Sequence, residues 1–319
     1  MHVLVTGGGG FIGSHLVEEL VLRGDHVRAL DDFSSGYRHN LDPWKNEIEI
    51  VEGDIRDPDI CAQAMKGIEV VFHQAAVASV PRSVADPWMT NTVNLDGTLR
   101  LLSASRDAGV RRFLFAGSSA VYGDAPELPK SEEQAPKPIS PYALQKLTSE
   151  QYLQLFHSLY GLETVTLRYF NVFGPRQDPQ SEYAAVIPKF ITRMLSGKAP
   201  IIFGDGLQTR DFIFVKDVVA ANLLAAESKA APGYVFNLAR GGSTNLRELV
   251  MTLNEVMGTE FTSEFAPPAS GDVRDSKASI KRLREILKFE PAVTMSEGLR
   301  RTVEWYKTQT AKISQNTTN

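Results

Sequence analysis

Short apolar runs rich in β-branched residues recur along the first half of the chain and alternate with stretches of helical periodicity. The predicted strands cover residues 3–6, 26–30, 48–51, 70–73, 113–116 and 164–167. Between the first two strands, Leu16, Val17, Leu20 and Val21 have the spacing of a helix that packs one face on a sheet. This alternation predicts parallel β-α-β units, and right-handed crossovers make the resulting α/β sheet doubly wound.

The pattern changes after residue 168, where glycine and proline become frequent, as in Gly174, Pro175, Pro179 and Pro188. This change predicts a second, smaller lobe. Strand-like runs at 211–215 and 235–238 can still return to the first sheet, so the boundary is not a single cut. We expect a sheet domain over 1–171 with 209–240 returning to it, a C-terminal lobe over 172–208 and 241–307, and a flexible polar tail over 308–319.

Composition narrows the function classes. The 319 residues are too many for one small core and fit two lobes of unequal size. No apolar run approaches the roughly 18 residues of a membrane span, so we expect a soluble protein without a membrane partner. The net charge of −4 comes without a basic block, which excludes nucleic acid as a partner.

Cysteine usage and the start of the chain add two expectations. Cys61 is the only cysteine, which excludes an internal disulfide and a cysteine-based zinc site, and we predict no metal. The chain opens on a strand-like segment without a charged and then apolar leader, which predicts a cytoplasmic protein.

A glycine series lies between the first predicted strand and the first predicted helix. Gly7, Gly10 and Gly13 form a G-x-x-G-x-x-G pattern. Glycine permits a tight turn and lets a pyrophosphate approach the backbone, while the helix that begins near Phe11 and Ile12 offers free N–H groups and a positive dipole end. A glycine triplet alone is weak, because many such sequences are only turns.

An acidic pair at the end of the second predicted strand strengthens this interpretation. Asp31 and Asp32 stand about 20 residues after the glycine series, where an acid is expected to bind the ribose hydroxyls of NAD. Such a carboxylate repels the additional phosphate of NADP, so NAD is the predicted cofactor. Aspartate is also common at helix N-caps and turns, but its place at the strand end favours the functional interpretation.

Two further strand ends are candidates for the same site. Asp54 and Ile55 end the third predicted strand, where an adenine contact and an ordinary turn are nearly equal interpretations. Gln74, Ala75 and Ala76 end the fourth in small residues, which allow a cofactor to lie against the backbone or simply permit close packing.

A tyrosine and a lysine provide the candidate chemistry. Tyr142 and Lys146 are four residues apart on one predicted helix face, so both can meet one ligand. Such pairs are common on solvated surfaces, but this one follows a strand that ends in Ser118 in a chain with a dinucleotide-binding turn. We expect the lysine ammonium to lower the pKa of the phenol, which makes Tyr142 a usable base, and Ser118 to hydrogen-bond the same substrate oxygen.

Together these residues resemble the extended short-chain dehydrogenases that modify nucleotide sugars, and the resemblance covers nearly the whole chain. It rests on residues 6–13, Asp31, 118–123, Tyr142, Lys146 and 168–171. Within that family the chain is most similar to UDP-hexose 4-epimerases, particularly the UDP-N-acetylglucosamine branch, through the strings DFSSG at 32–36, SVPRS at 79–83 and YFNVFGPRQDP at 169–179.

The resemblance implies a Rossmann-type sheet domain with a nucleotide-sugar lobe, and it implies roles for the candidate residues. Tyr142 takes the proton of the sugar 4-hydroxyl, Lys146 holds the nicotinamide ribose, and Ser118 bridges to the reacting oxygen, with Ser119 as a lesser candidate. Tyr169 is implied as a further cofactor contact.

The resemblance also implies the substrate-binding residues. Asn171 and Arg210 contact the diphosphate or nucleotide of a UDP-sugar, although Arg210 with its acidic neighbour can also form a surface ion pair of little value. Ala185 and Val186 line the uridine pocket, although they can also belong to a packed loop. Ser79 is implied as a further substrate contact.

Two positions near residue 271 bear on the substrate. Many relatives have an arginine for the diphosphate where this chain has Ala269, and either Arg274 or Arg176 can replace it. In members of the family it resembles that are restricted to plain hexoses, the position that matches Ser276 is a bulky tyrosine. The small serine leaves room for a 2-acetamido group, although it can also be a turn residue.

The candidate reaction is NAD-dependent 4-epimerisation, because the acid pair that dehydratases place after the active-site hydroxyl is replaced by Ser119 and Ala120. UDP-glucuronate 4-epimerisation or dehydration on the same fold remains open, and so does a non-catalytic NAD(P)-binding sensor, although such sensors commonly lack the Tyr-Lys pair. Apolar positions within 93–102 and 144–155 predict two exposed helices that pair in a homodimer, unless they only pack on the sheet.

Overall fold

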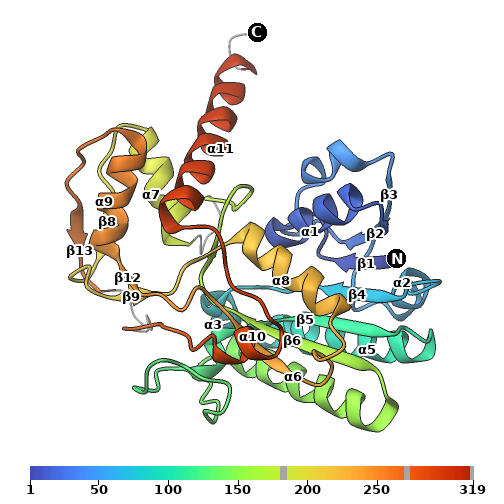
Figure 1. Cartoon of the computed structure of the whole chain (residues 1–319). Coiled ribbons are helices and arrows are strands. Elements are labelled where there is room, and N and C mark those ends of the chain that lie inside the picture. The colour runs from blue at the N-terminus through green and yellow to red at the C-terminus, as the bar shows by residue number, and fades with distance from the viewer. Residues whose placement is uncertain (180–184, 269–273, 317–319) are drawn as a thin grey trace.

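The central feature of the fold is a parallel sheet (Figure 1). The computed structural model describes residues 1–179, 185–268 and 274–316. Within these residues, seven strands form one sheet in the order β11-β6-β5-β4-β1-β2-β3, and every neighbouring pair is parallel. The strands are β1 (His2–Thr6), β2 (His26–Asp31), β3 (Ile48–Glu52), β4 (Val70–His73), β5 (Arg112–Ser118), β6 (Glu163–Tyr169) and β11 (Val235–Leu238). All six strands predicted along the first half of the chain are present, and the doubly wound α/β fold is confirmed.

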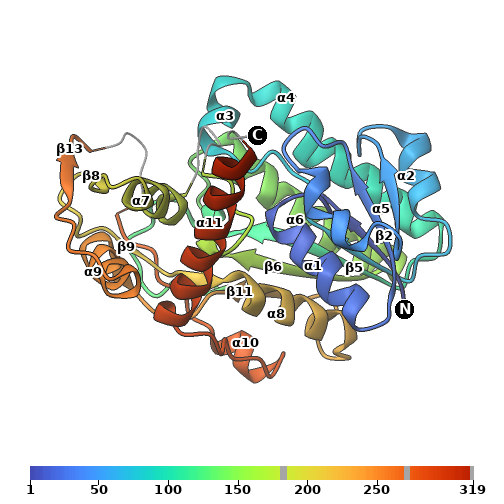
Figure 2. The ribbon, with the colours of Figure 1, turned by 90° about the horizontal axis from the view of Figure 1, so that it is seen from above.

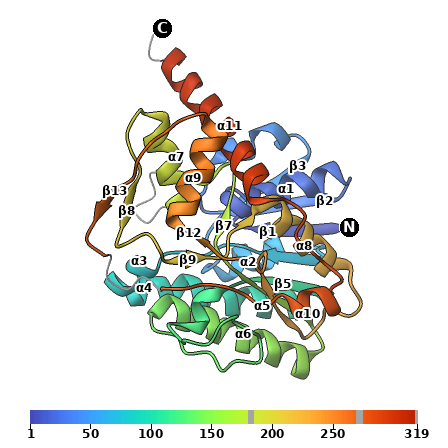
Figure 3. The same ribbon diagram turned by 60° about the vertical axis from the view of Figure 1, so that its left-hand side comes forward.

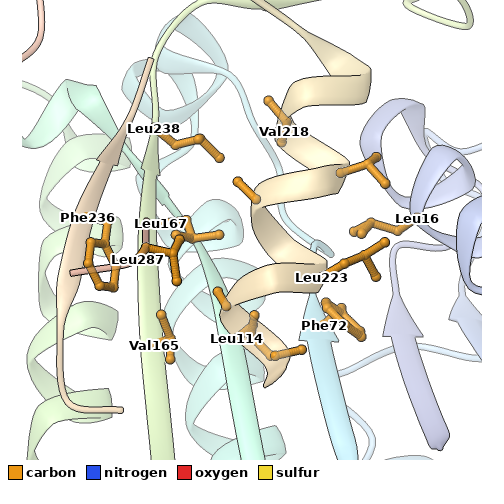
Figure 4. Packing of buried hydrophobic residues seen from close by; sticks show 14 of the residues in the cluster. Leu16, Phe72, Leu114, Val165, Leu167, Val218, Leu223, Phe236, Leu238 and Leu287 are labelled. Carbon is orange, nitrogen blue, oxygen red and sulfur yellow. The ribbon is translucent and has the colours of Figure 1, made fainter. Parts of the chain in front are cut away.

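One face of the sheet is covered by α1 (Phe11–Leu22), α8 (Val215–Glu227) and α10 (Lys281–Glu285). Leu16 of α1 and Leu223 of α8 meet Phe72 of β4 in one buried cluster, and Leu238 of β11 closes it at the sheet edge (Figure 4). The inner strands β1, β4 and β5 are almost continuously buried because helices cover both of their faces.

The opposite face carries α2 (Pro58–Ala64), α5 (Thr98–Asp107) and α6 (Pro141–Tyr160), whose apolar residues form a second buried cluster. Between β4 and α5 the chain forms two short helices, α3 (Val80–Ala85) and α4 (Pro87–Asn91), and then a π-helical segment, η3 (Thr92–Gly97). Both α3 and α4 pack against the first part of α6. The chain thus brings α3, which follows β4, to the helix that carries Tyr142.

The C-terminal lobe lies beside the end of the sheet (Figures 2 and 3). Its buried cluster joins α7 (Val186–Leu195), α9 (Leu246–Met257) and α11 (Met295–Asn316), with Phe173 and Phe214 at its centre. Short strand pairs connect the lobe: β7 (Val172–Phe173) with β10 (Ile213–Phe214), β9 (Thr209–Arg210) with β12 (Thr244–Asn245), and β8 (Ile201–Phe203) with β13 (Glu264–Ala266).

The remaining short helices lie in loops of the sheet domain. They are η1 (Arg38–Asn40), η2 (Asp42–Trp44) and η4 (Ser119–Tyr122). The loop that contains η1 wraps around the glycine turn, since Tyr37 N and Asn40 Nδ2 both donate to Gly9 O, at 2.9 and 2.8 Å.

Several expectations about the second half of the chain are corrected. Residues 211–215 do not return to the central sheet, because β10 pairs with β7, whereas residues 235–238 lie at its edge as β11. The segment 278–289, expected in the C-terminal lobe, packs with the sheet: Leu283 and Leu287 join the cluster under α8, since α10 lies against β11. The flexible tail over 308–319 stays a prediction; within it, α11 continues as far as Asn316, and no glycine or proline interrupts residues 308–316.

The two apolar faces predicted for a dimer are also not both exposed. Leu102 of α5 is fully buried, and Leu147 of α6 packs against the sheet core. Helical spacing identifies an apolar face but not whether the sheet or solvent meets it. The exposed apolar residues on α6 include Leu144, Leu155 and Leu159, which are 54, 50 and 67% exposed and lie on one stripe of the helix, and Tyr160 at its end.

Candidate active site

The candidate site lies where β1 and β4 are neighbours in the sheet. The chain leaves β1 for α1 on one face and leaves β4 for helices on the other, so the carboxyl ends of these two strands border the crevice at which doubly wound sheets bind ligands. Gly7, Asp31, Gln74 and Ser118 all stand at or just after the carboxyl ends of strands.

The glycine turn is shaped by two close approaches of backbone. Gly7 has φ of +68°, and a Cβ there would lie 2.8 Å from Ala75 N. A Cβ on Gly13 would lie 2.0 Å from Gly7 O. Neither position accepts a side chain, which leaves an open backbone surface between β1 and the start of α1.

The start of α1 offers backbone donors. Its N-cap is Gly10, which has no side chain to cap the helix, and the first turn contains no acidic residue. The first N–H groups of a helix have no intrahelical partner, so those of Phe11, Ile12 and Gly13 suit an anion such as a pyrophosphate. The side chains of Phe11 and Ile12 pack against the core of the C-terminal lobe.

Asp31 and Asp32 differ in burial and in hydrogen-bond partners. The carboxylate of Asp31 is buried beside the glycine turn, where it accepts hydrogen bonds from Gly9 N and Phe33 N, both at 2.8 Å. Burial raises the pKa of Asp31, and the two backbone hydrogen bonds partly offset that rise. Asp32 is exposed and accepts from Ser34 N at 2.9 Å. Asp31 is therefore the better candidate for a ribose contact.

The third strand end offers mainly backbone. The carboxylate of Asp54 is held by the guanidinium of Arg56, with Nε 3.0 and 2.9 Å from its two oxygens, and this lowers the pKa of Asp54. The Ile55 side chain is buried in the core under α2 and α5. Any adenine contact by Ile55 would therefore use its backbone.

A polar pair lies at the end of β4. The hydroxyl of Tyr169 lies 3.2 Å from Gln74 Oε1 and accepts from Asn222 Nδ2 at 2.9 Å, and burial raises the pKa of Tyr169 to about 12. The Nε2 group of Gln74 is buried and has no partner among the described residues. With the backbone cradle at Gly7 and Ala75, this unpaired donor fits a bound dinucleotide.

Tyr142, Lys146 and Ser118 come together at the first turns of α6. Ser118 ends β5, and its Oγ accepts from Ala120 N at 3.2 Å. Lys146 is 4% exposed, donates from Nζ to Ala116 O at 2.9 Å, and lies 6.0 Å from the centroid of the Tyr142 ring.

We expected Lys146 to lower the pKa of Tyr142, but in the structure the pKa of Tyr142 is raised. Burial raises the pKa of Tyr142, and the hydrogen bond with Ser118 only partly offsets the rise. Burial also lowers the pKa of Lys146 to about 7. The lysine turns its ammonium toward a backbone carbonyl, and burial, not the lysine, determines the direction in which the pKa of Tyr142 shifts.

The candidate substrate residues of the second lobe meet around β9. Asn171 donates from Nδ2 to Asp211 O at 3.2 Å. Arg210 donates from Nη1 to Thr209 O at 2.7 Å. Asp211 is fully buried and does not pair with Arg210, contrary to the alternative of a surface ion pair; it accepts from the backbone N–H of Arg240 at 3.0 Å and of Ala278 at 3.1 Å.

Arg274 and Ser276 run alongside the same strand. The guanidinium of Arg274 holds both carboxylate oxygens of Asp205, at 3.0 and 2.9 Å, on an exposed surface. Ser276 is half-buried and donates its N–H to Thr209 O at 3.1 Å. Ala269 and residues 270–273 lie outside the described residues.

The other candidates stand at helix starts. Ala185 is the exposed N-cap of α7 and Val186 its first residue. Ser79 is the N-cap of α3, where its Oγ accepts from Arg82 N at 3.1 Å. Ser119 is the first residue of η4, and Ala76 is half-buried after β4.

Sequence reasoning missed a buried polar group under the site. His73 Nδ1 lies 2.7 Å from Thr6 Oγ1, and Nε2 lies 2.9 Å from Thr98 Oγ1. Thr98 donates its own proton to Asn94 O, so it accepts from Nε2–H and Thr6 donates to Nδ1. Burial lowers the pKa of His73 to about 3, so the ring is neutral. A histidine that ends an otherwise apolar strand was the available signal.

Known proteins resemble this chain over nearly its full length. The model of the NAD dependent epimerase/dehydratase family matches residues 3–239. The UDP-glucose 4-epimerase of Mycolicibacterium smegmatis is 43% identical over 311 residues, which cover 96% of this chain and 99% of that protein.

Two solved structures are similar in fold as well as in sequence. The UDP-N-acetylglucosamine 4-epimerase from Methanobrevibacter ruminantium, in complex with UDP-N-acetylmuramic acid, is 44% identical with a TM-score of 0.93, over 97% of this chain and 98% of that one. The UDP-glucose 4-epimerase of Thermus thermophilus, in complex with NAD, is 40% identical with a TM-score of 0.88, over 96% and 99%. Separately, no helix within the described residues is long and apolar enough to span a membrane.

Proposed function

Because the chain belongs to the NAD-dependent epimerase/dehydratase family, we propose that it interconverts the C4 epimers of UDP-hexoses, both with a 2-acetamido group and without one. The enzyme is an isomerase, and its cofactor is NAD. The observation that carries the proposal is the group formed by Ser118, Tyr142 and Lys146 beside a complete dinucleotide turn.

We assign the cofactor to the surface around the glycine turn. The first N–H groups of α1 would hold the pyrophosphate, Asp31 the ribose hydroxyls of the adenosine, and the unpaired Gln74 amide the nicotinamide half. Bound NAD supplies a hydride acceptor. The reaction is redox-neutral overall, so the cofactor can remain bound between turnovers.

Tyr142 would move the proton. In the forward half, the 4-hydroxyl of the sugar gives its proton to the Tyr142 phenolate while C4 gives up a hydride, which leaves a 4-keto sugar. After this sugar turns its other face, C4 regains the hydride and the oxygen regains the proton from Tyr142. Ser118 hydrogen-bonds the same oxygen, and Lys146 orients the cofactor ribose.

The residues after Ser118 favour epimerisation over dehydration. Elimination of water requires an acid and a base beside the 4-keto sugar, and here Ser119 and Ala120 occupy the first turn of η4. With no carboxylate at these two positions, return of the hydride is the simplest fate of the keto sugar.

The proposed tolerance of the acetamido group rests on Ser276. Its backbone is held in register with β9, one residue from Arg210, through the hydrogen bond to Thr209 O. Asp275 fixes the same register, because its Oδ1 accepts from Thr209 Oγ1 at 2.6 Å. A small side chain at this fixed position would leave space in the sugar pocket.

One experiment tests both the reaction and the substrate range. Purified enzyme is incubated without added cofactor with UDP-glucose or with UDP-N-acetylglucosamine, and the sugars are identified by NMR. We expect the 4-epimer from each. Ser276→Tyr should abolish turnover of the acetamido sugar and spare the plain hexose, whereas Lys277→Tyr, at the exposed neighbouring position, should spare both. Equal treatment of both substrates by Ser276→Tyr would remove the support for acetamido specificity.

We propose a corresponding division of the chain. Residues 1–171, with β11 and the segment 278–289 that packs on the sheet, form the NAD domain. Residues 172–214 and the rest of 241–307 form the UDP-sugar lobe, and residues 215–240 return to the NAD domain through α8 and β11.

We also propose a homodimer. The contact surface on α6 is the exposed stripe of Leu144, Leu155 and Leu159, in place of the wider face expected from sequence. Exposed apolar helices of this kind are buried when two copies form a four-helix bundle.

A further inference from the structure

A buried serine from α3 holds the backbone of the catalytic tyrosine. Ser83 is fully buried. Its Oγ–H donates to Val80 O at 2.6 Å, and its Oγ accepts from Tyr142 N at 3.0 Å. The hydroxyl thus uses its proton within α3 and a lone pair for the first turn of α6, where Tyr142 lies 59 residues after Ser83 in the chain.

The contact satisfies a donor that the helix itself leaves unpaired. The first N–H groups of α6 have no intrahelical partner. Ser140, the N-cap, accepts from Ala143 N at 3.2 Å, and Pro141 has no N–H. Tyr142 N is then the first-turn donor left over, and Ser83 supplies its acceptor from another helix.

A second link, one turn further along α6, joins it to the next helix, α4. Gln145 Nε2 donates to Thr90 Oγ1 at 3.0 Å, in α4. Tyr142 and Gln145 therefore attach α6 to the segment that begins at Ser79, the N-cap of α3 and a proposed sugar contact. Two hydrogen bonds thus join the segment with the proposed sugar contact to the helix with the proposed proton-transferring residue.

We infer that Ser83 is a positioning residue, which holds the Tyr142 phenol in register with the sugar bound beside α3. This rests on the proposed function, because it assumes that Tyr142 exchanges the proton of the 4-hydroxyl. Misplacement of a reacting group by about 1 Å lowers turnover by about 10²-fold. Without the Ser83 hydroxyl, Tyr142 N loses its acceptor from α3, while the Ser140 cap and the Gln145 link to α4 remain.

The test compares Ser83→Ala with Ser140→Ala, since each variant removes one side-chain acceptor from the first turn of α6. Ser83→Ala should lower kcat about 10- to 100-fold with little change in KM or in bound NAD. Ser140→Ala removes the other side-chain acceptor from the same helix turn without touching α3. Ser140→Ala should lower the melting temperature by about as much as Ser83→Ala does, and it should leave kcat near that of the parent enzyme. Equal losses of kcat in the two variants would reduce Ser83 to an ordinary helix cap and overturn the inference.

A double-mutant cycle separates this inference from the proposed function. If Ser83 acts through the phenol, Ser83→Ala should not slow Tyr142→Phe further. If Ser83→Ala lowers the residual rate of Tyr142→Phe by the same factor as in the parent, the inference is wrong although the function stands. If Tyr142→Phe alone keeps near-normal turnover, the proposed role of Tyr142 fails.

Discussion

The strongest structural prediction concerns the contact between Gly13 and Gly7. In Gly13→Ala the added Cβ would lie 2.0 Å from Gly7 O, 2.8 Å from Gly7 C and 3.1 Å from Gly8 Cα. All three are backbone atoms in a turn that β1 and β4 hold from both sides, so no flexible side chain can move aside. The start of α1 must therefore move away from the turn.

The size of that movement follows from the contact. Carbon-to-oxygen contacts under 3.0 Å do not occur at real Cβ atoms, so the helix and the turn must separate by about 1 Å. Overpacking of this kind costs about 1–3 kcal/mol of unfolding free energy. With an unfolding entropy of about 2.1 cal/mol/K per residue, a chain of this length should melt about 2–5 °C lower.

The effect on NAD should exceed the effect on stability. In the proposed cofactor site, the pyrophosphate hydrogen bonds come from N–H groups of the helix that moves, and each hydrogen bond to a charged group is worth about 1.5–3 kcal/mol. Loss of one bond weakens binding about 10- to 100-fold. We expect Gly13→Ala to purify largely without NAD, as measured by the absorbance of cofactor released on denaturation.

Substitutions of two further glycines should affect NAD retention less. In Gly10→Ala the Cβ would lie 3.2 Å from Gly7 O, a tight contact that small shifts relieve, so NAD retention should fall only in part. In Gly242→Ala the Cβ would have no neighbour within 4 Å, and NAD content should match that of the parent. If Gly13→Ala retained NAD in the same amount as Gly242→Ala, the assignment of the pyrophosphate to this turn would be refuted.

Three further predictions concern the ion pair, the buried histidine and the dimer. Glu150 and Arg168 form a pair at 2.6 Å with side chains 5 and 4% exposed, so Glu150→Ala strands a buried guanidinium and should lower the unfolding free energy by about 3–5 kcal/mol in urea titrations. A loss within 1 kcal/mol would show that water or another residue compensates the charge. The pKa of His73 is lowered from 6.5 to about 3 in the folded chain. The unfolded chain therefore binds one more proton between these pH values, and stability falls as pH falls, by about 1.4 kcal/mol per pH unit from this residue. His73→Gln should remove that part of the slope; an unchanged slope between pH 6 and 4 would show that the folded chain protonates the ring. Leu155→Glu should give a monomer by light scattering if the exposed stripe of α6 is the dimer contact, and a parent dimer unaffected by this change would place the contact elsewhere.

Strands were predictable from sequence where both faces of the sheet are covered by helices. Residues 3–6 and 70–73 are continuously apolar because neighbours bury them from both sides. Residues 211–215 have the same local character, but their pairing with β7 depends on the C-terminal lobe and not on their own pattern. The packing of Leu283 on the sheet likewise depends on the contact of α10 with β11, a strand that ends more than 40 residues earlier in the chain.

The residues of the candidate site were likewise predictable where they are close in sequence and not where their contacts span many residues. Gly7, Gly13 and Asp31 were predictable because the turn, the helix start and the strand end are close in sequence. The contact from Ser83 to Tyr142 spans 59 residues, and that from Thr6 to His73 spans 67. Neither has a local signature, since a buried serine and a strand histidine are compatible with many surroundings.

The protonation of Tyr142 shows what the spacing of two residues leaves undetermined. An interval of four residues predicts that Tyr142 and Lys146 share a helix face, but the direction of the lysine depends on the neighbouring strand, whose Ala116 carbonyl accepts from Nζ. Burial then acts on both groups, raising the pKa of the phenol and lowering that of the ammonium to about 7. Among the described residues, the hydrogen bond with Ser118 is the one contact that lowers the pKa of the phenol. The oxidised nicotinamide is a cation, and a positive charge near a phenol favours its ionised form. Proton abstraction by Tyr142 should therefore depend on the cofactor being bound and oxidised, which would suppress removal of the proton when no hydride acceptor is present.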